Sequence, residues 1–313
     1  MKKHIFIIVS FLFFISCEEI VHVDLEESEE RLVINASLNW FRNYPENTMD
    51  FGNEQIISLS KTVGYYNEVQ AASNAVVRVT NNDNNEVFNF FEESNSGIYK
   101  STNFKPLLNN TYTLYINYNG EDYTAEDKLI DSPVIDSIQQ IKGGFFRDDE
   151  IVLHVYYKDN GNEENYYYFD YITSISDIKS LSITNDRFVN GNSTYQLINY
   201  RGGRDDEKKI EIGDVFDIKF FEINSFYYQY LNILTDQIYN SGMFDPIPAE
   251  VKGNIINLSN EKHYPYGFFR IALGNKASVI INEEDLIVNQ KLNSKNKKSR
   301  FKRDFLLTFV YFF

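Results

Sequence analysis

The chain has very few cysteines and histidines. Cys17 is its one cysteine, and only four of its 313 residues are histidines. A single cysteine excludes an intrachain disulfide and a thiolate cluster for zinc or iron–sulfur. Of the histidines, His22, His154 and His263 follow the first sixteen residues; they lie far apart, and none has an H-E-x-x-H spacing. G-x-S-x-G is also missing. We therefore expect no enzyme activity, no resident metal and no other cofactor.

Positive charge is also scarce. Lys and Arg number 30 against 45 Asp and Glu, which gives a net charge of -15. Proteins that bind nucleic acid need clustered Lys and Arg to neutralise phosphates, so the composition argues against such a partner. Hydrophobic residues make up 43% of the chain and include 26 Phe and 23 Tyr. That supply is enough for a sizeable core, and the Tyr, Phe, Ile and Val content favours strands.

The longest apolar run stands at the N-terminus. Lys2 and Lys3 precede Ile5–Ile15, a run of about eleven residues with Ser10 as its one polar member. This layout is typical of a secretory signal and is too short for a helix of roughly 20 residues that spans a bilayer. We therefore assign residues 1–16 to a lipoprotein signal peptide.

Cys17 directly follows that run. The preceding Phe-Ile-Ser resembles a bacterial lipobox, although Phe14 replaces the usual Leu. Cleavage before Cys17 would leave a cysteine that carries acyl chains such as palmitate, and several chains hold a protein firmly on a membrane. The alternative is a buried structural cysteine, which is common in general. We interpret Cys17 as the lipidation site because it lies between an apolar signal and an acidic segment.

An acidic segment comes next. Residues 17–30 read as a solvated tether. Glu18 and Glu19 stand where some surface-exposed lipoproteins carry an acidic export mark. An acidic run is equally consistent with an ordinary linker, so the export signal and the membrane face both stay open.

Residues 31–130 show the period-two alternation of strands. The segment contains six or seven short antiparallel strand candidates, and the clearest alternates Tyr112, Leu114, Ile116 and Tyr118 before Asn119-Gly120. An Asn-Gly pair supplies the two positive-φ residues of a type I′ hairpin turn. The pattern predicts an immunoglobulin-like antiparallel β-sandwich.

A second β-rich domain is predicted over residues 131–290, after a boundary at Ser132-Pro133. Its alternating strands are interrupted near residues 225–241, where apolar positions recur with the 3.6-residue period of an amphipathic helix. Residues 174–210 are mostly polar and are assigned to loops. The fold class is thus mainly β, with one helix in the second domain.

The C-terminal tail is unusual. Residues 291–303 carry seven basic and no acidic residues, and the apolar residues 305–313 end the chain. Such a segment could touch an anionic membrane surface. The alternatives are an edge strand or a divergent tail outside the folded unit, and we favour these for residues 291–313.

Two small sets of side chains are candidates for binding. Trp40, Tyr65 and Tyr66 lie near predicted loops and could stack on a sugar, although such aromatics are more often core residues. Asp159 and Glu163 flank a glycine-containing acidic loop and are weak candidates for Ca²⁺, because the loop lacks the twelve-residue pattern of an EF-hand.

Several stretches together resemble the bacterial family called domain of unknown function 4249. They are Cys17 with its acidic follow-on, RLVINASL, NAVVRV, GIYKSTNFKPLLNNTYTLYI, SPVIDSI, NYYYF, FYYQYLNIL and PIPAEVKGNIIN…GFFRIAL. The resemblance covers about residues 17–282. It implies an outer-membrane lipoprotein, a β-sandwich followed by a second β-rich region, and a gene often found beside a TonB-dependent receptor.

Two functions are therefore expected. The first is a non-enzymatic lipoprotein of the outer membrane that assists a TonB-dependent receptor in nutrient uptake, on the cell surface or on the periplasmic face. The second is a surface adhesion or glycan-binding module. The sequence indicates neither the ligand nor the oligomeric state.

Overall fold

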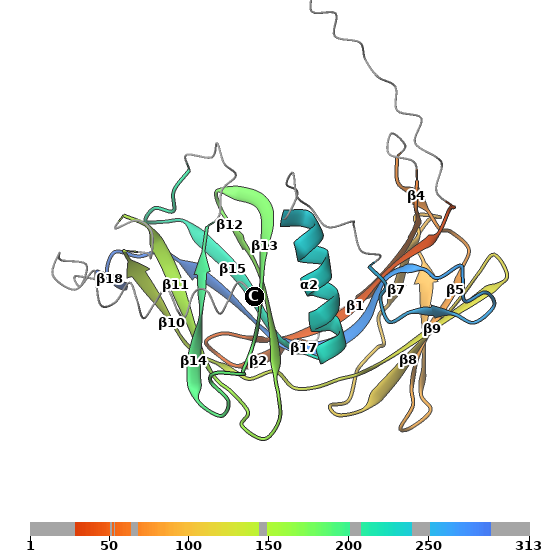
Figure 1. Cartoon of the computed structure of the whole chain (residues 1–313), viewed down its shortest axis with the longest axis horizontal. Coiled ribbons are helices and arrows are strands. Elements are labelled where there is room, and N and C mark those ends of the chain that lie inside the picture. The colour runs from red at the N-terminus through yellow and green to blue at the C-terminus, as the bar shows by residue number, and fades with distance from the viewer. Residues whose placement is uncertain are drawn as a thin grey trace, which may run out of the picture.

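The structure, a computed structural model, describes residues 29–50, 52, 54–63, 68–143, 149–200, 208–239 and 251–288. The expected fold class is confirmed: these residues form strands arranged as two β-sandwiches, with one α-helix between them (Figure 1). Cys17, the tether up to residue 28 and the tail 291–313 lie outside the described residues. No helix within the described ranges is both long and apolar enough to span a membrane.

The first sandwich encloses the larger core. Its buried faces come from alternate residues of each strand, so polar neighbours point to solvent. Its strands are β1 (Leu32–Asn43), β2 (Thr48–Asp50), β3 (Gln55–Lys61), β4 (Gln70–Ala71) and β7 (Ile98–Ser101) on one side, and β5 (Val76–Asn81), β6 (Val87–Glu92), β8 (Thr111–Tyr118), β9 (Glu121–Lys128) and β16 (Ile256–Asn257) on the other.

The second sandwich packs a four-stranded sheet against the far end of the large sheet. Aromatic rings dominate its core, where Phe169 and Phe220 stack at 4.4 Å. Its strands are β12 (Tyr166–Thr173), β13 (Ser176–Asn185), β15 (Val215–Ile223) and β17 (Tyr266–Ile280) in the large sheet, and β10 (Ile135–Lys142), β11 (Ile151–Lys158), β14 (Ser193–Asn199) and β18 (Leu286–Val288) in the small one.

The hairpin between β8 and β9 has the predicted turn. Asn119 and Gly120 adopt φ values of 50° and 81°, and Tyr118 pairs directly with Glu121. Both values lie in the left-handed region that a type I′ turn requires. The local sequence therefore sets the register of this hairpin.

Strands β1 and β17 join the two sandwiches. They pair in parallel from Val33 opposite Tyr266 to Asn43 opposite Lys276, and Figure 1 shows them running together beneath the helix. Through this pairing β17 places Phe269, Ile271 and Leu273 in the first core. The predicted second domain, residues 131–290, includes β16 and β17, and both pair with strands of the first sandwich. Pairing between strands so far apart in sequence leaves no local signal.

The predicted helix is confirmed as α2 (Ser225–Tyr239). Asn224 caps it, because its Oδ1 accepts a hydrogen bond from the Tyr227 backbone N–H at 2.8 Å. The helix covers the face of the large sheet opposite the second core and buries Tyr227 and Leu231 against Phe221 and Phe268. The central strands are consequently buried on both faces.

The assignment of residues 174–210 to loops is wrong in part. This stretch contains β13 and β14, which lie at the edges of their sheets. Edge strands are half-solvated, so Ser, Thr and Asn replace the apolar residues that identify a central strand. The polar composition concealed both strands.

Candidate functional site

Trp40 is not a surface aromatic. Its side chain is 1% exposed in the first core, and its ring meets that of Phe104 edge-on at 5.2 Å. Strand β1 continues to Asn43, so the alternation that buries Leu38 also buries Trp40. The prediction that Trp40 binds a ligand is therefore wrong. Tyr65, Tyr66, Cys17, Glu18 and Glu19 lie outside the described residues.

Asp159 and Glu163 do not act together. Asp159 is buried, and its carboxylate accepts hydrogen bonds from the Tyr167 hydroxyl and, at 2.6 Å, from the Gly191 backbone N–H. Glu163 is exposed and accepts a bond from the Asn160 amide at 3.2 Å. The two Asp159 oxygens thus tie this loop to strand β12 and to the turn at Gly191. Over the described ranges, no three His, Cys, Asp or Glu side chains converge as metal ligands would.

Two further acids, the half-buried Glu222 and the buried Asp186, lie near Asp159. Glu222 accepts a hydrogen bond from the Asn165 amide at 2.8 Å, and Asp186 is 1% exposed with its Oδ2 unpartnered within the described part of the chain. Burial raises the pKa of Glu222 to about 7, and nearby acids add to the rise. Burial likewise raises the pKa of the Asp186 carboxyl. Burial and neighbouring acids thus favour the protonated forms of Glu222 and Asp186.

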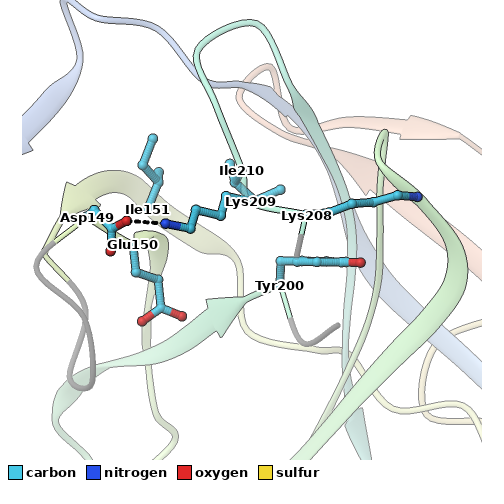
Figure 2. Close-up of a pocket in the computed structure, with 7 residues that line it drawn as sticks. All are labelled: Asp149, Glu150, Ile151, Tyr200, Lys208, Lys209 and Ile210. Atoms are coloured by element: carbon cyan, nitrogen blue, oxygen red, sulfur yellow. Dashed lines mark hydrogen bonds and ion pairs between the residues drawn. The ribbon is translucent and has the colours of Figure 1, made fainter. Parts of the chain in front are cut away.

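A small pocket lies where β11 begins (Figure 2). Its volume of about 20 Å³ has room for roughly one water molecule, far less than a small-molecule site needs. Lys209 reaches across it to Asp149, with Nζ 2.5 Å from Oδ2. The lining residues are Asp149, Glu150, Ile151, Tyr200, Lys208, Lys209 and Ile210.

Arg270 is buried beneath α2. Its side chain on β17 is 4% exposed, and its guanidinium carbon lies 4.5 Å from the ring centre of Phe221 and 5.1 Å from that of Tyr227. One Nη donates to Asn39 Oδ1 at 2.7 Å, while Nε and the other Nη have no partner among the described residues. Contacts with aromatic faces stabilise a desolvated cation, so Arg270 fixes the helix on the sheet.

Asp127 joins three elements next to Arg270. Its oxygens accept hydrogen bonds from the Ile271 backbone N–H of β17 and from the side chain of Asn224, both at 2.9 Å. The carboxylate thereby links β9, β17 and the cap of α2. Burial raises its pKa to about 6, because removing the charge from water costs more than these bonds return.

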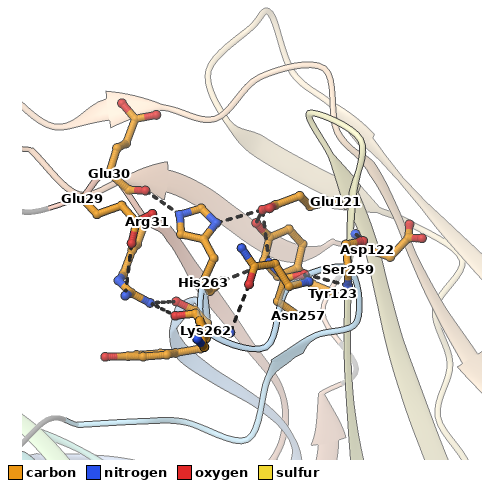
Figure 3. A network of polar contacts seen from close by, with 12 residues as sticks. Glu29, Glu30, Arg31, Glu121, Asp122, Tyr123, Asn257, Ser259, Lys262 and His263 are labelled. Atoms are coloured by element: carbon orange, nitrogen blue, oxygen red, sulfur yellow. Dashed lines mark hydrogen bonds and ion pairs between the residues drawn. The ribbon is translucent and has the colours of Figure 1, made fainter.

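A polar cluster surrounds the point where the chain enters the first sandwich (Figure 3). His263 lies between the two partners of its ring: Nδ1 is 3.0 Å from Glu121 Oε2, and Nε2 is 2.8 Å from the Glu30 carbonyl oxygen. Arg31 donates to the carbonyl oxygens of Lys262 and Tyr264 at 3.1 and 3.0 Å. We call these contacts of residues 29–31 with residues 262–264 and Glu121 the entry clamp.

An exposed row of side chains runs over the edge of the first sandwich where β7 pairs with β6 and the two sides meet. Ile56, Lys100 and Phe91 are direct partners on β3, β7 and β6, and Val76 lies on the neighbouring strand β5. Phe91 is 73% exposed, Val76 56% and Ile56 45%. Exposed apolar side chains on adjacent strands are a feature of contact surfaces.

A second aromatic group lies on the outer face of the four-stranded sheet. Tyr195 is 47% exposed, and its ring stacks on His154 at 4.1 Å with Tyr156 at 5.3 Å. Burial lowers the pKa of His154, so this ring is neutral at physiological pH. These three residues come from β11 and β14, and no spacing in the sequence marks them as a group.

The chain matches the family described as domain of unknown function (DUF4249) over residues 18–276. The chain belongs to this family. The resemblance inferred from the quoted stretches is therefore confirmed, and the match ends before residue 291. No curated protein matches the chain.

Two solved structures are similar at low identity. A two-domain fibronectin type-III segment of chicken tenascin is 10% identical, with a TM-score of 0.20, over 65% of this chain and 91% of that one. A DUF4785 family protein from Legionella pneumophila is 8% identical, with a TM-score of 0.24, over 61% of this chain and 52% of that one. These matches carry no information on function.

Proposed function

We propose that this member of the DUF4249 family is a non-enzymatic outer-membrane lipoprotein. It is anchored through acylated Cys17 and assists a TonB-dependent receptor in nutrient uptake. The observation that carries the proposal is the entry clamp. Residues 29–31 follow the acidic tether and are bonded to the turn at 262–264, so the folded body would be presented to its partner from one end.

The exposed row on the first sandwich is the proposed contact with the receptor. Phe91, Val76 and Ile56 would lose solvent exposure on binding, and each fully buried side chain of this kind contributes roughly 1.5–3 kcal/mol. Lys100 within the row already pairs with Glu54 and Glu93 at 3.2 and 3.0 Å, so its charge is compensated before binding. Lys100 stands between Ile56 and Phe91, so the row would offer a partner apolar side chains on both sides of one compensated charge.

Affinity purification of the full chain from cross-linked outer membranes tests this proposal. We expect a TonB-dependent receptor to be recovered with the wild type and lost with Phe91→Glu. Ile178→Glu is the matched control, because Ile178 is 76% exposed on β13 of the second sandwich. Recovery of no receptor with the wild type, together with unchanged nutrient uptake after deletion of the gene, would contradict the proposal.

The aromatic group on the four-stranded sheet favours a second candidate, a glycan-binding module. Tyr195 presents an exposed ring supported by His154 and Tyr156, and such a ring offers an apolar face on which a sugar can stack. Glycan-array binding that disappears in Tyr195→Ala but persists in Phe188→Ala would support it, since Phe188 is also exposed (65%). An array without signal for the wild type argues against this function.

A further inference from the structure

The ring of His263 has an oxygen acceptor at each nitrogen. Nε2 faces the Glu30 carbonyl oxygen at 2.8 Å, and Nδ1 faces Glu121 Oε2 at 3.0 Å. A neutral imidazole carries one N–H, so it can donate to only one of these acceptors. Its other nitrogen would then present a lone pair to an oxygen lone pair. The imidazolium form donates to both, and this geometry therefore fits the protonated ring.

The partner carboxylate is held in place from two other sides. Glu121 Oε2 also accepts hydrogen bonds from the Tyr123 hydroxyl at 2.6 Å and from the Asn257 amide at 3.1 Å. The same Asn257 amide donates to the His263 carbonyl oxygen at 2.9 Å. Glu121 consequently cannot turn away when His263 loses its proton, so the mismatch falls on the contact with Glu30.

Charged groups around His263 come from each element that packs there. The anions are Glu121 and Asp122 of β9 together with Glu29 and Glu30 of the entry segment, by which we mean residues 29–31. The cations are Arg31 of the same segment, Lys61 of β3 and Lys262 of the turn. Lys61 pairs with Glu30 at 3.1 Å and Arg31 with Glu29 at 3.5 Å. Each entry-segment acid thus has its own cation, which leaves Glu121 as the carboxylate in contact with the ring. The Glu30 carbonyl and then Glu121 raise the pKa of His263.

Other contacts of the entry clamp do not depend on a proton. Arg31 keeps its charge at any physiological pH, and its bonds to the carbonyl oxygens of Lys262 and Tyr264 stay in place. Its guanidinium also lies 4.1 Å from the ring centre of Tyr264. Deprotonation of His263 therefore loosens the Glu30 main chain, while Arg31 keeps β1 in position.

We propose that His263 is a proton-gated latch on the entry segment. The protonated ring fastens the Glu30 main chain to Glu121 of β9, and the neutral ring releases it. In a lipid-anchored protein the latch would control how freely the folded body moves on its tether. That consequence rests on the proposed function, whereas the latch itself is a property of the folded chain.

Nuclear magnetic resonance of the full chain in detergent tests the latch. We expect the His263 ring to titrate above pH 6.5, and the Glu30 and Arg31 amide signals to shift with the same midpoint. His154, whose pKa is lowered by burial, titrates below that pH and serves as the internal control. Glu121→Gln lowers the His263 midpoint, and His263→Gln abolishes the titration of the two amides.

Two results would overturn the latch. One is a His263 midpoint at or below 6.5, and the other is Glu30 and Arg31 amides that do not follow the ring. Glu121→Gln keeps an acceptor for Tyr123 and Asn257, so it tests the latch if His263→Gln fails to fold. Neither readout depends on acylation of Cys17 or on a receptor, so failure of the latch and failure of the proposed function are distinguishable.

Discussion

The two sandwiches hold ionisable groups in opposite ways. At the entry of the first, His263 lies between Glu121 and the Glu30 carbonyl, and these partners favour its charged form. In the second, Glu222 has one amide partner and other acids nearby, so burial favours its neutral form. Both arrangements bind protons more tightly in the folded state than in the unfolded chain.

Partners that favour the charged form of a histidine and burial that favours the neutral form of a carboxyl group thus have the same consequence: each makes the free energy of unfolding fall as pH rises. The pKa of Glu222 is raised to about 7, so its folded form retains a proton that the unfolded chain has already lost. The free energy of unfolding then falls as pH rises toward 7. His263, with its pKa raised, contributes stability that is complete below pH 6.5 and is lost as pH rises through its folded pKa. Glu222 and His263 therefore both favour higher stability at pH 5.5 than at pH 8, whereas His154, whose pKa is lowered by burial, acts in the opposite direction.

The largest loss of stability is expected from a substitution that disrupts the pairing of β1 with β17, which joins the two sandwiches. Gly267 has φ +106°, and a Cβ there would lie 1.9 Å from the Ile34 carbonyl oxygen of β1. We expect Gly267→Ala to lower the free energy of unfolding by about 4 kcal/mol or more, because the added Cβ forces the backbones of β1 and β17 apart. Gly120→Ala is the control: φ is +81° but a Cβ there meets nothing, so roughly 1 kcal/mol is lost. Denaturant unfolding measures both, and equal losses would contradict the parallel pairing.

Removing the largest side chain of the first core comes next. Trp40→Ala should cost about 3–5 kcal/mol, since it empties a fully buried aromatic site. Trp40→Phe keeps an aromatic ring and should cost less. Thermal unfolding of both variants measures the loss. A Trp40→Ala protein as stable as the wild type would show that this side chain is not buried.

Glu222→Gln tests the second half of this comparison, in which burial favours a neutral carboxyl group. The amide keeps an oxygen for Asn165 but has no charge to bury, so the variant should be more stable than the wild type by about 2 kcal/mol at pH 8. Near pH 4 the two proteins should be equally stable. Urea unfolding across this pH range is the measurement, and a constant difference at every pH would exclude Glu222 as the titrating group.

The smallest effect concerns the helix between the sandwiches. Asn224→Ala removes the cap of α2 and should lower the free energy of unfolding by about 1 kcal/mol. Asn224→Ser keeps a capping oxygen and should restore most of the loss. If the serine variant were no more stable than the alanine variant, the contact of Asn224 with Asp127 would account for the effect instead.

Local patterns predicted the local elements. The alternation before Asn119-Gly120 gave the β8–β9 hairpin, and the 3.6-residue period gave α2. Trp40 was misplaced because β1 runs farther than its apolar start suggests. Edge strands β13 and β14 were missed because solvated strands lack the apolar alternation.

The polar sites depend on contacts that no spacing encodes. His263 and Glu121 are 142 residues apart in the chain, so only the folded structure brings them together. The sequence showed His263 only as an isolated histidine. Arg270 and Asp127 looked like ordinary strand charges until the pairing of β1 with β17 and the position of α2 buried them.

We propose that the folded body is carried on a lipid anchor at Cys17. Metabolic labelling with a palmitate analogue, followed by fractionation of membranes, tests it most directly in the wild type and in Cys17→Ser. We predict that the wild type incorporates label and stays with the outer membrane, whereas Cys17→Ser incorporates none and is released. A Cys17→Ser protein that remained in the membrane fraction would contradict the account.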